Sequence, residues 1–230
     1  MIELSGLQDV GCLSGSTLVL PAVSIGNVGQ LSVDLLVYNL GLKRVGFLQS
    51  QYVLPSIGND AYSASGTGEL AIELELYNSA MFPQVYIMQQ RAPVIVGCQE
   101  KFANELVTWS KSVGFSQVVV LTTFDSAFRK DAQILDTQLR FISTEDVCLF
   151  SSMGLRPLEE NEAGDGLEEP KRKTGPWPLL RQGRAAALPV SALCMFASEG
   201  DNVPDAVRMA AAAAEALGLA AAAAAAAPAW

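Results

Sequence analysis

The stretch TLVLPAVSIGNVG, residues 17–29, decides the fold of this chain. Its first four residues form an apolar run that is typical of a short buried strand. From residue 27 to residue 40 the apolar side chains recur on one helical face, and Asn27 is expected to cap the first turn. Gly41 suits the position just after the helix, where φ is often positive. A strand follows at Val45–Leu48, so the pattern predicts a βαβ unit with a right-handed crossover.

A second stretch, SEGDNVPD at residues 198–205, repeats this arrangement. It follows an apolar strand at Val190–Ala197 and opens another helical pattern. Pro204 suits the first turn of a helix, where its missing N–H costs nothing. Asn202 or Asp201 can cap the start of this helix. Turns of this kind lie at the carboxyl ends of strands, where open α/β sheets usually bind their ligands.

Further elements alternate along the rest of the chain. Strict alternation of apolar and polar residues from 69 to 77 predicts a strand with one wet face. The other expected elements are a strand at Val85–Met88, a helix from Phe102 to Gly114, a strand at Val118–Leu121 and a short helix at Leu179–Ala187. We therefore expect one α/β domain in which helices flank a mixed, mostly parallel sheet, in Rossmann-like layers.

Several charged or simple segments are expected to be structural surface. Glu69, Glu73 and Glu75 fall on the wet face of the alternating strand, where acids are normally solvated. The polar stretch 122–140 is typical of a connecting loop. Residues 156–176 are acidic with almost nothing apolar to bury, so they predict a flexible insertion within a single domain spanning 1–230. An alanine-rich helix and tail occupy about 204–230.

The composition excludes several classes of function. The net charge of −9 over 230 residues disfavours nucleic-acid binding, which depends on cationic contacts with phosphates. The chain has no histidine, which removes imidazole bases and histidine-based nucleophile pairs. Its four cysteines are far apart, so we expect buried, reduced thiols rather than a zinc site. No run is long enough to span a membrane and no secretory signal is evident, which favours the cytoplasm or nucleus.

Both turns have an alternative interpretation. Residues 24–29 match G-x-G-x-x-G except that Ser24 replaces the first glycine, but no acid follows about twenty residues later to hold a ribose. Nucleotide or small-ligand binding at this turn remains the alternative. In the second turn, Glu199, Asp201 and Asp205 are oxygen ligands of the kind that Mg²⁺ or Ca²⁺ prefers, but the calcium-loop spacing is absent and we favour helix capping and turn formation as their role.

The two turns also carry a family resemblance. Residues 17–31 and 196–206 resemble the proteasome assembly chaperone family, in the branch that pairs with proteasome assembly chaperone 1. The segments between them also fit in order and spacing, and the resemblance spans about residues 10–210.

The resemblance implies a non-catalytic chaperone without a cofactor or metal. Such a chain would form a heterodimer with proteasome assembly chaperone 1, bind proteasome α-subunits, promote assembly of the α-ring of the 20S proteasome and block premature association of rings. Some relatives end in a hydrophobic-tyrosine-any tripeptide that inserts between α-subunits, whereas this chain ends Pro228-Ala229-Trp230. We therefore expect ring binding to rely more on the domain surface. The expected partner-binding residues are Ser24, Gly26, Asn27, Gly29, Glu199, Gly200, Asp201, Asn202, Pro204, Asp205 and Trp230.

Overall fold

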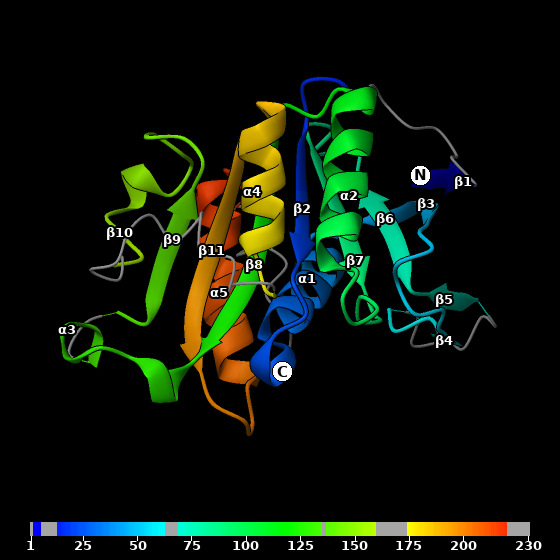
Figure 1. The fold of residues 1–230 in the computed structure, drawn as a ribbon. Helices are drawn as coiled ribbons and strands as arrows, with labels where there is room; N and C mark the ends of the chain where they lie inside the picture. Colours follow the sequence, from blue (N-terminus) through cyan, green and yellow to red (C-terminus); the bar gives the residue numbers. More distant parts are fainter. Residues whose placement is uncertain (1, 6–12, 63–68, 135–136, 160–173, 220–230) are drawn as a thin grey trace.

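The computed structural model describes residues 2–5, 13–62, 69–134, 137–159 and 174–219. Within these residues, nine strands form one sheet in the order β1-β3-β6-β7-β2-β8-β11-β9-β10 (Figure 1). In that order the strands are Glu3–Ser5, Lys43–Gln49, Leu74–Asn78, Val85–Gln90, Thr17–Pro21, Gln117–Asp125, Val190–Ala197, Leu139–Ser143 and Arg156–Pro157.

The centre of the sheet is parallel and its two sides are mostly antiparallel. Strands β7, β2, β8 and β11 run in one direction, with Val19 paired to both Ile87 and Val119. Every residue of β2 and β11 is buried, as expected for parallel strands covered on both faces. β6 and β3 join one side in antiparallel pairing, and β9 joins the other. The predicted mixed α/β sheet is therefore confirmed.

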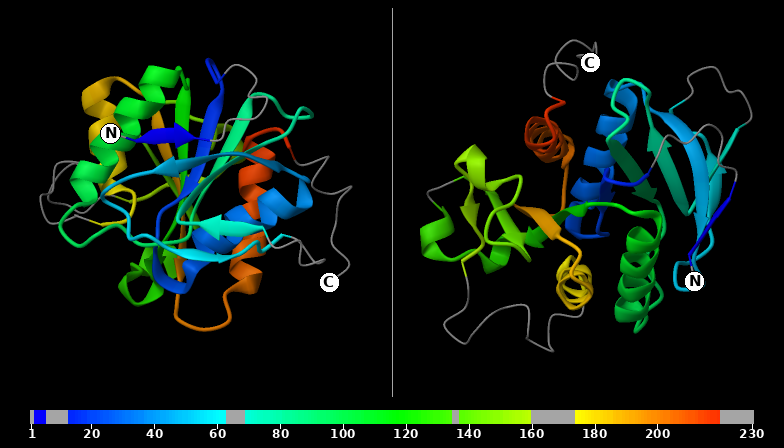
Figure 2. Two further views of the ribbon diagram at one scale, coloured as in Figure 1. Left: turned by 90° about the vertical axis from the view of Figure 1, so that its right-hand side faces the viewer. Right: turned by 90° about the horizontal axis from the view of Figure 1, so that it is seen from above.

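Helices cover both faces of this sheet, as Figure 2 shows from above. Helices α2 (Gln99–Val113) and α4 (Trp177–Ala186) pack on one face, and α1 (Val28–Asn39) and α5 (Val203–Ala216) pack on the other. Short helical turns complete the set at η1 (Ile25–Asn27), η2 (Ser126–Phe128), α3 (Asp131–Ile134) and η3 (Ser151–Met153). Each helical layer encloses its own hydrophobic cluster, the first around Leu106 and Leu180 and the second around Val33 and Met209.

Small side chains allow α1 and α5 to approach closely. Ala206, Ala210 and Ala213 are buried on α5 at helical spacing. On α1, the hydroxyl oxygen of Ser32 lies 2.7 Å from the carbonyl oxygen of Val28 and 3.1 Å from that of Ala206. Part of the alanine-rich stretch is therefore a helix–helix contact surface. Residues 220–230, including the second alanine run and Trp230, lie outside the described residues.

The expected helix ends are partly confirmed. Gly41 and Gly114 both have positive φ just after their helices, and Pro204 lies in the first turn of α5. The prediction that Asn27 caps α1 through its side chain is wrong, because Asn27 has a left-handed backbone (φ 52°) and makes no side-chain cap bond. The strands of the expected βαβ unit, β2 and β3, run parallel, but β7 and β6 lie between them.

The alternating strand predicted around residues 69–77 is divided in two. Its first part is β5 (Leu70–Ile72), which pairs with β4 (Ile57–Asn59) in a separate hairpin. Its second part is β6, in which every residue is buried. The expectation of three solvated glutamates is wrong for Glu75, whose side chain is 0% exposed.

The ends of the predicted insertion are tied to the domain. Residues 156–157 form β10, which pairs with β9, and α4 begins at Trp177. Glu159 accepts hydrogen bonds from Gln133 and from the fully buried Arg140, whose Nε lies 3.1 Å from Glu159 Oε1. Burial alone would raise the pKa of Glu159, but these hydrogen bonds hold it below its ordinary value. Residues 160–173 lie outside the described residues.

Candidate partner-binding end of the sheet

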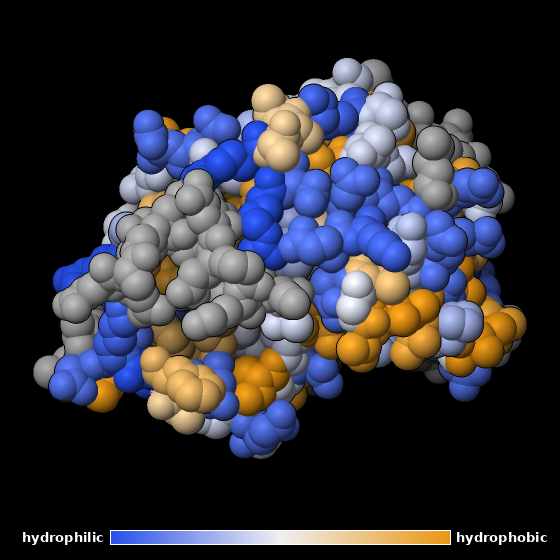
Figure 3. Space-filling view, in the orientation of Figure 1, coloured by the Kyte–Doolittle hydropathy of each residue, from blue (hydrophilic) through white to orange (hydrophobic). Residues whose placement is uncertain are grey.

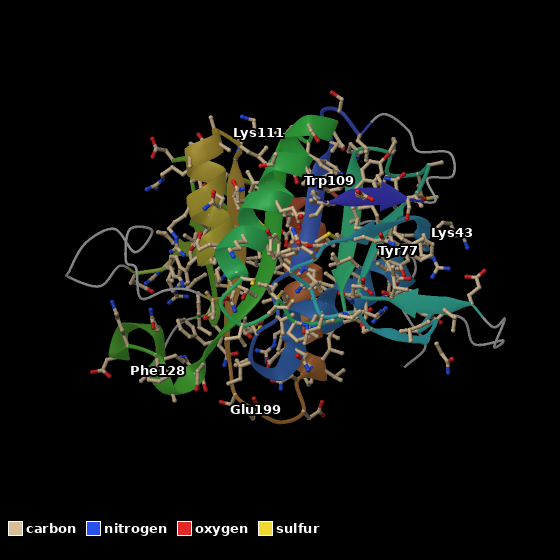
Figure 4. The ribbon with its side chains drawn as sticks, turned by 45° about the vertical axis from the view of Figure 1, so that its right-hand side comes forward. Lys43, Tyr77, Trp109, Lys111, Phe128 and Glu199 are labelled. Carbon is tan, nitrogen blue, oxygen red and sulfur yellow. The ribbon has the colours of Figure 1, made fainter. Side chains whose placement is uncertain are left out.

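Three turns gather where the parallel strands β2, β8 and β11 end. Because these strands are adjacent and parallel, residues 22–27, 126–130 and 198–202 emerge at the same end of the sheet. Phe128 and Glu199, from two of these turns, both lie at this end of the molecule, and Lys111 lies at the opposite end (Figure 4). The two stretches that carried the sequence prediction are therefore brought together.

Gly26, in the first turn (residues 22–27), packs against Asn202, in the second turn (residues 198–202). The third turn is residues 126–130. Gly26 has φ +66°, and a Cβ at this position would lie 2.4 Å from Asn202 Nδ2. Asn202 is buried and donates from Nδ2 to the carbonyl of Gly200 at 3.0 Å. Its side chain therefore stabilises its own turn and fills the space over Gly26. In a dinucleotide site that space is left open for the pyrophosphate, so this packing disfavours the nucleotide alternative.

Gly29 and Ser24 fix the first turn against β8. A Cβ on Gly29 would lie 2.4 Å from the carbonyl oxygen of Leu121, so only glycine fits at this position in the first turn of α1. The N–H of Thr123 donates to Ser24 Oγ at 3.0 Å, and the Thr123 hydroxyl donates to the carbonyl of Ile25 at 2.7 Å. The sequence prediction did not include Thr123, which follows an apolar run with no distinguishing pattern. Ser24 and Gly29, which the sequence analysis expected to bind a partner, therefore stabilise the turn.

Two acidic residues at the second turn, Asp201 and Asp205, make hydrogen bonds to nearby residues of α5. Asp201 Oδ1 accepts from the N–H of Val203 at 3.1 Å, so the helix start is capped from Asp201 and not from the side chain of Asn202. Asp205 pairs with Arg208 at 2.7 Å within α5. Among the described residues, no group of three His, Cys, Asp or Glu side chains could hold a metal ion. Asn27, Glu199, Gly200, Asp201 and Pro204 are exposed and form the outer surface of this end.

The third turn contributes an aromatic surface that the sequence prediction treated as an ordinary loop. The hydroxyls of Ser126 and Ser198 hydrogen-bond and join it to the second turn. Asp125 accepts from the N–H of Ala127 at 2.9 Å and caps η2, while the side chain of Phe128 is 83% exposed. A hollow of about 260 Å³ lies beside it, lined by Phe124, Asp125, Phe128, Lys130, Gln133, Leu158, Glu159, Trp177 and Phe196.

A smaller apolar hollow of about 160 Å³ opens on the other side of the first turn. Its walls are the end of β2, the loop before α2 and the starts of α2 and α4, and they include Pro21, Val23, Pro93, Phe102 and Leu179. Both hollows are shallow and mostly apolar. They suit side chains presented by another protein better than a charged metabolite.

A charged cluster that the sequence did not reveal lies under the β4–β5 hairpin. Glu75 is 2.9 Å from Arg44 Nη1 and 3.7 Å from Arg91 Nε, and it accepts from the Tyr77 hydroxyl at 2.9 Å. Arg91 also pairs with Asp34 of α1 at 3.2 Å. The alternating pattern predicts that Glu75 faces solvent. No residue near it in the sequence indicates that Arg44 and Arg91, from two other segments, contact it.

Tyr62 extends this cluster to the segment that follows β4. Its hydroxyl donates to Asp34 Oδ1 at 2.6 Å, and its ring meets that of Tyr77 edge-on at 5.4 Å between centroids. Burial, followed by the nearby carboxylates, raises the pKa of both tyrosines well above their usual value near 10. Burial alone would lower the pKa of Arg91, but Asp34 and the two tyrosines raise it. Tyr62, Tyr77 and Arg91 are therefore held in their protonated forms within the cluster.

The cysteines form no disulfide among the described residues. Cys98, Cys148 and Cys194 are all free. Of these three, only Cys194 is buried, and burial raises the pKa of its thiol; Cys12 lies outside the described residues. The expectation of buried thiols is thus confirmed for Cys194 and wrong for Cys98 and Cys148, which are partly exposed. In addition, no helix among the described residues has both the length and the apolar character to cross a membrane.

The sheet is covered by helices on both faces, and the turns at its strand ends pack closely against one another. The described residues form surface hollows at this end and no group that could hold a metal ion. These features define the class as an α/β protein. The model of the PAC2 family matches residues 18–222, and the chain therefore belongs to the PAC2 family.

Curated relatives support the same assignment. Proteasome assembly chaperone 2 of Nematostella vectensis is 34% identical over 212 residues, covering 85% of this chain and 86% of the relative. The protein of that name from Danio rerio is 32% identical over 216 residues, covering 88% and 83%. The human one is 30% identical over 212 residues, covering 85% and 78%. The names of these relatives place them among chaperones of proteasome assembly.

Solved structures share the fold at lower identity. Pyrococcus furiosus PbaA, described as an archaeal homolog of proteasome-assembly chaperone, matches with a TM-score of 0.69 at 17% identity, covering 95% of this chain and 87% of PbaA. PbaB from the same organism, described as an archaeal proteasome activator, matches with a TM-score of 0.65 at 15% identity, covering 95% and 89%. The single α/β architecture is thus common to this chain and the archaeal proteins.

Proposed function

We propose that this chain is a non-catalytic chaperone of proteasome assembly that works as one half of a heterodimer with proteasome assembly chaperone 1. The pair promotes assembly of the α-ring of the 20S proteasome and blocks off-pathway association of rings, in the cytoplasm and nucleus. The observation that carries this proposal is the 34% identity to a proteasome assembly chaperone 2 over 85% of the chain.

The loop end of the sheet, formed by residues 22–27, 126–130 and 198–202, supplies the surface that contacts α-subunits. Asn27, Phe128 and Glu199 lie on turns that are joined by the Gly26–Asn202 packing and the Ser126–Ser198 hydrogen bond, so we expect binding to require little reordering of the chain. A chaperone that binds an incomplete ring adds contact area to a weak intermediate and shifts its population by mass action. It also covers a face that another ring would otherwise meet.

Affinity capture of the tagged chain from cells of its own organism tests this proposal. We expect mass spectrometry to identify proteasome assembly chaperone 1 and α-subunits in fractions that contain immature proteasomes. The chain should be missing from mature 20S particles, whereas a permanent structural subunit would remain there. Recovery of neither partner would overturn the proposal.

A thermal-shift measurement tests the nucleotide alternative. Millimolar ATP or NAD should leave the melting temperature of the purified chain unchanged, since Asn202 occupies the space over Gly26. A rise of several degrees that is lost in a Ser24→Ala variant would favour the alternative over the chaperone.

A further inference from the structure

An apolar surface lies beside the loop end, on the β7 side of the sheet, and is formed by two segments that are joined by hydrogen bonds. Residues 52–54 pair with residues 93–95 through the Val53–Val94 bridge, with Leu54 N–H donating to the Pro93 carbonyl at 3.1 Å. Val53 is buried, whereas Leu54 is exposed and Val96 is 92% exposed. Figure 3 shows orange surface over the region where the loop before α2 and the β4–β5 hairpin lie in Figure 1.

The register of the β4–β5 hairpin continues this surface. Ile57 pairs with Ile72, and Asn59 pairs with Leu70, so Ile57, Leu70 and Ile72 share one face of the hairpin. The opposite face carries Gly58 and Ala71, and Ala71 is buried against the domain. Ile57 is 71% exposed. We call Leu54, Ile57, Leu70, Ile72 and Val96 the apolar shelf.

The charged cluster beneath the hairpin holds the apolar shelf in place. Arg44 donates to the backbone carbonyl of Leu70 at 3.0 Å and also pairs with Glu69 and with buried Glu75. These bonds anchor the Leu70 part of the shelf, and the side chains of Leu54, Ile57, Leu70 and Val96 are exposed. Such a surface has the character of a contact with another protein.

An acidic hollow adjoins the apolar shelf. It has a volume of about 380 Å³ and is lined by Glu3, Gln49, Ser50, Gln51 and Glu73. Glu73 follows Ile72 directly and accepts from the N–H of Ser56 at 3.3 Å, which places the hollow at the edge of the shelf. Its two ionisable side chains are both acids, so it complements a Lys or Arg from another chain.

The charges disfavour a second copy of this chain as the occupant. In a twofold contact, the same acidic hollow would have to find basic groups on an identical face. Arg44 and Arg91, which lie under that face, are already engaged with Glu69, Glu75 and Asp34. Each copy also carries a net charge of −9. A partner with its own apolar face and a flanking Lys or Arg complements the shelf better.

We propose that the apolar shelf and its acidic hollow dock the sister chaperone of the heterodimer, which presents apolar side chains beside a Lys or Arg. This inference rests on the function proposed above. Permanent protein interfaces are more apolar than transient ones, so the shelf suits the lasting partner. The loop end combines exposed Phe128 with exposed acids such as Glu199 and Asp201, and this mixed surface suits a client that is later released.

Binding of the full chain to the purified sister chaperone tests this assignment. The double variant Ile57→Asp/Val96→Asp should weaken binding by about 10- to 100-fold, as expected for the centre of an interface. Glu73→Gln should slow association about two- to fivefold and reduce its dependence on salt. Met81→Asp is the matched control: Met81 is 74% exposed but lies at the other end of β6, and this variant should bind as the wild type does. Unchanged circular dichroism and melting temperature establish that each variant folds.

The possible results separate this inference from the function it rests on. If the wild type binds the sister chaperone and the double variant binds it equally well, the shelf assignment is overturned while the chaperone function stands. If the double variant retains the sister chaperone and loses only α-subunits, the shelf contacts the ring and the assignment is again wrong. If the wild type alone forms a dimer that the double variant abolishes, a second copy occupies the shelf. If the wild type binds no sister chaperone at all, both proposals fail.

Discussion

Gly26 packs directly against the side chain of Asn202, although the two residues lie near opposite ends of the sequence. This contact joins the turn before α1 to the turn before α5. It depends on the absence of a side chain at Gly26, whose backbone is also left-handed.

Replacing Gly26 with alanine is expected to destabilise the fold by about 2–4 kcal/mol, because the new Cβ meets Asn202 and the positive φ is strained. Urea unfolding measures the loss. Gly41→Ala is the control, since Gly41 has φ +60° and a Cβ there would meet nothing within 4 Å, so this change should cost only about 1 kcal/mol. Equal losses at the two positions would mean that the contact with Asn202 does not matter.

Glu75→Gln should destabilise the protein by about 3–5 kcal/mol, because Arg44 and Arg91 would lose their buried counter-charge. Glu69 also pairs with Arg44 but is largely exposed, and Glu69→Gln should cost less than about 1 kcal/mol. Denaturant midpoints of the two variants provide the comparison. A tolerated change at Glu75 would contradict the structural role assigned to the charged cluster.

Alkaline pH should destabilise the fold through Tyr62 and Tyr77. Their folded pKa values are raised above the unfolded value near 10, so their contribution is fully present below about pH 10 and is lost as pH rises beyond it. The free energy of unfolding of the wild type should therefore fall as the pH rises from about 9.5 to about 11, the range in which the tyrosines of the unfolded chain ionise. Tyr62→Phe should flatten this fall. Phenolate absorbance checks the premise: either tyrosine ionising near pH 10 in the folded protein would refute it.

Glu199→Arg should slow the association of the chain with α-subunits without changing its stability by more than about 0.5 kcal/mol, because Glu199 is exposed on the loop end. Stopped-flow or surface-based kinetics at low salt measure the rate. Glu145→Arg makes the same charge change at an exposed position beyond β9 and serves as the control. Identical rates for the two variants would remove the loop end from the contact.

The sequence predicted the elements that strong local patterns define. Strand β11 was predicted with the observed bounds, and α2 ends at Gly114 as expected, because a continuous apolar run and a glycine after a helix are local signals. The meeting of the two turns at one end of the sheet also followed from the parallel direction of their strands.

Features that depend on distant segments were missed. Glu75 has the alternation of a surface residue, and only the folded sheet brings Arg44 and Arg91 to it. Asn27 has the composition of a helix cap, but the left-handed backbone of the turn leaves its side chain without a cap bond. Fully buried Arg140 likewise depends on Glu159, which lies on a strand-end segment that the sequence pattern indicated to be solvated.

The Ser32–Ala206 contact has a mechanical consequence for the loop end. Because α1 and α5 touch through Ser32 and Ala206 as well as through the turns that precede them, a displacement of one turn must carry the other helix with it. The two contacts couple the helices behind the strand-end surface, so a client that binds one turn also meets a surface shaped by the other.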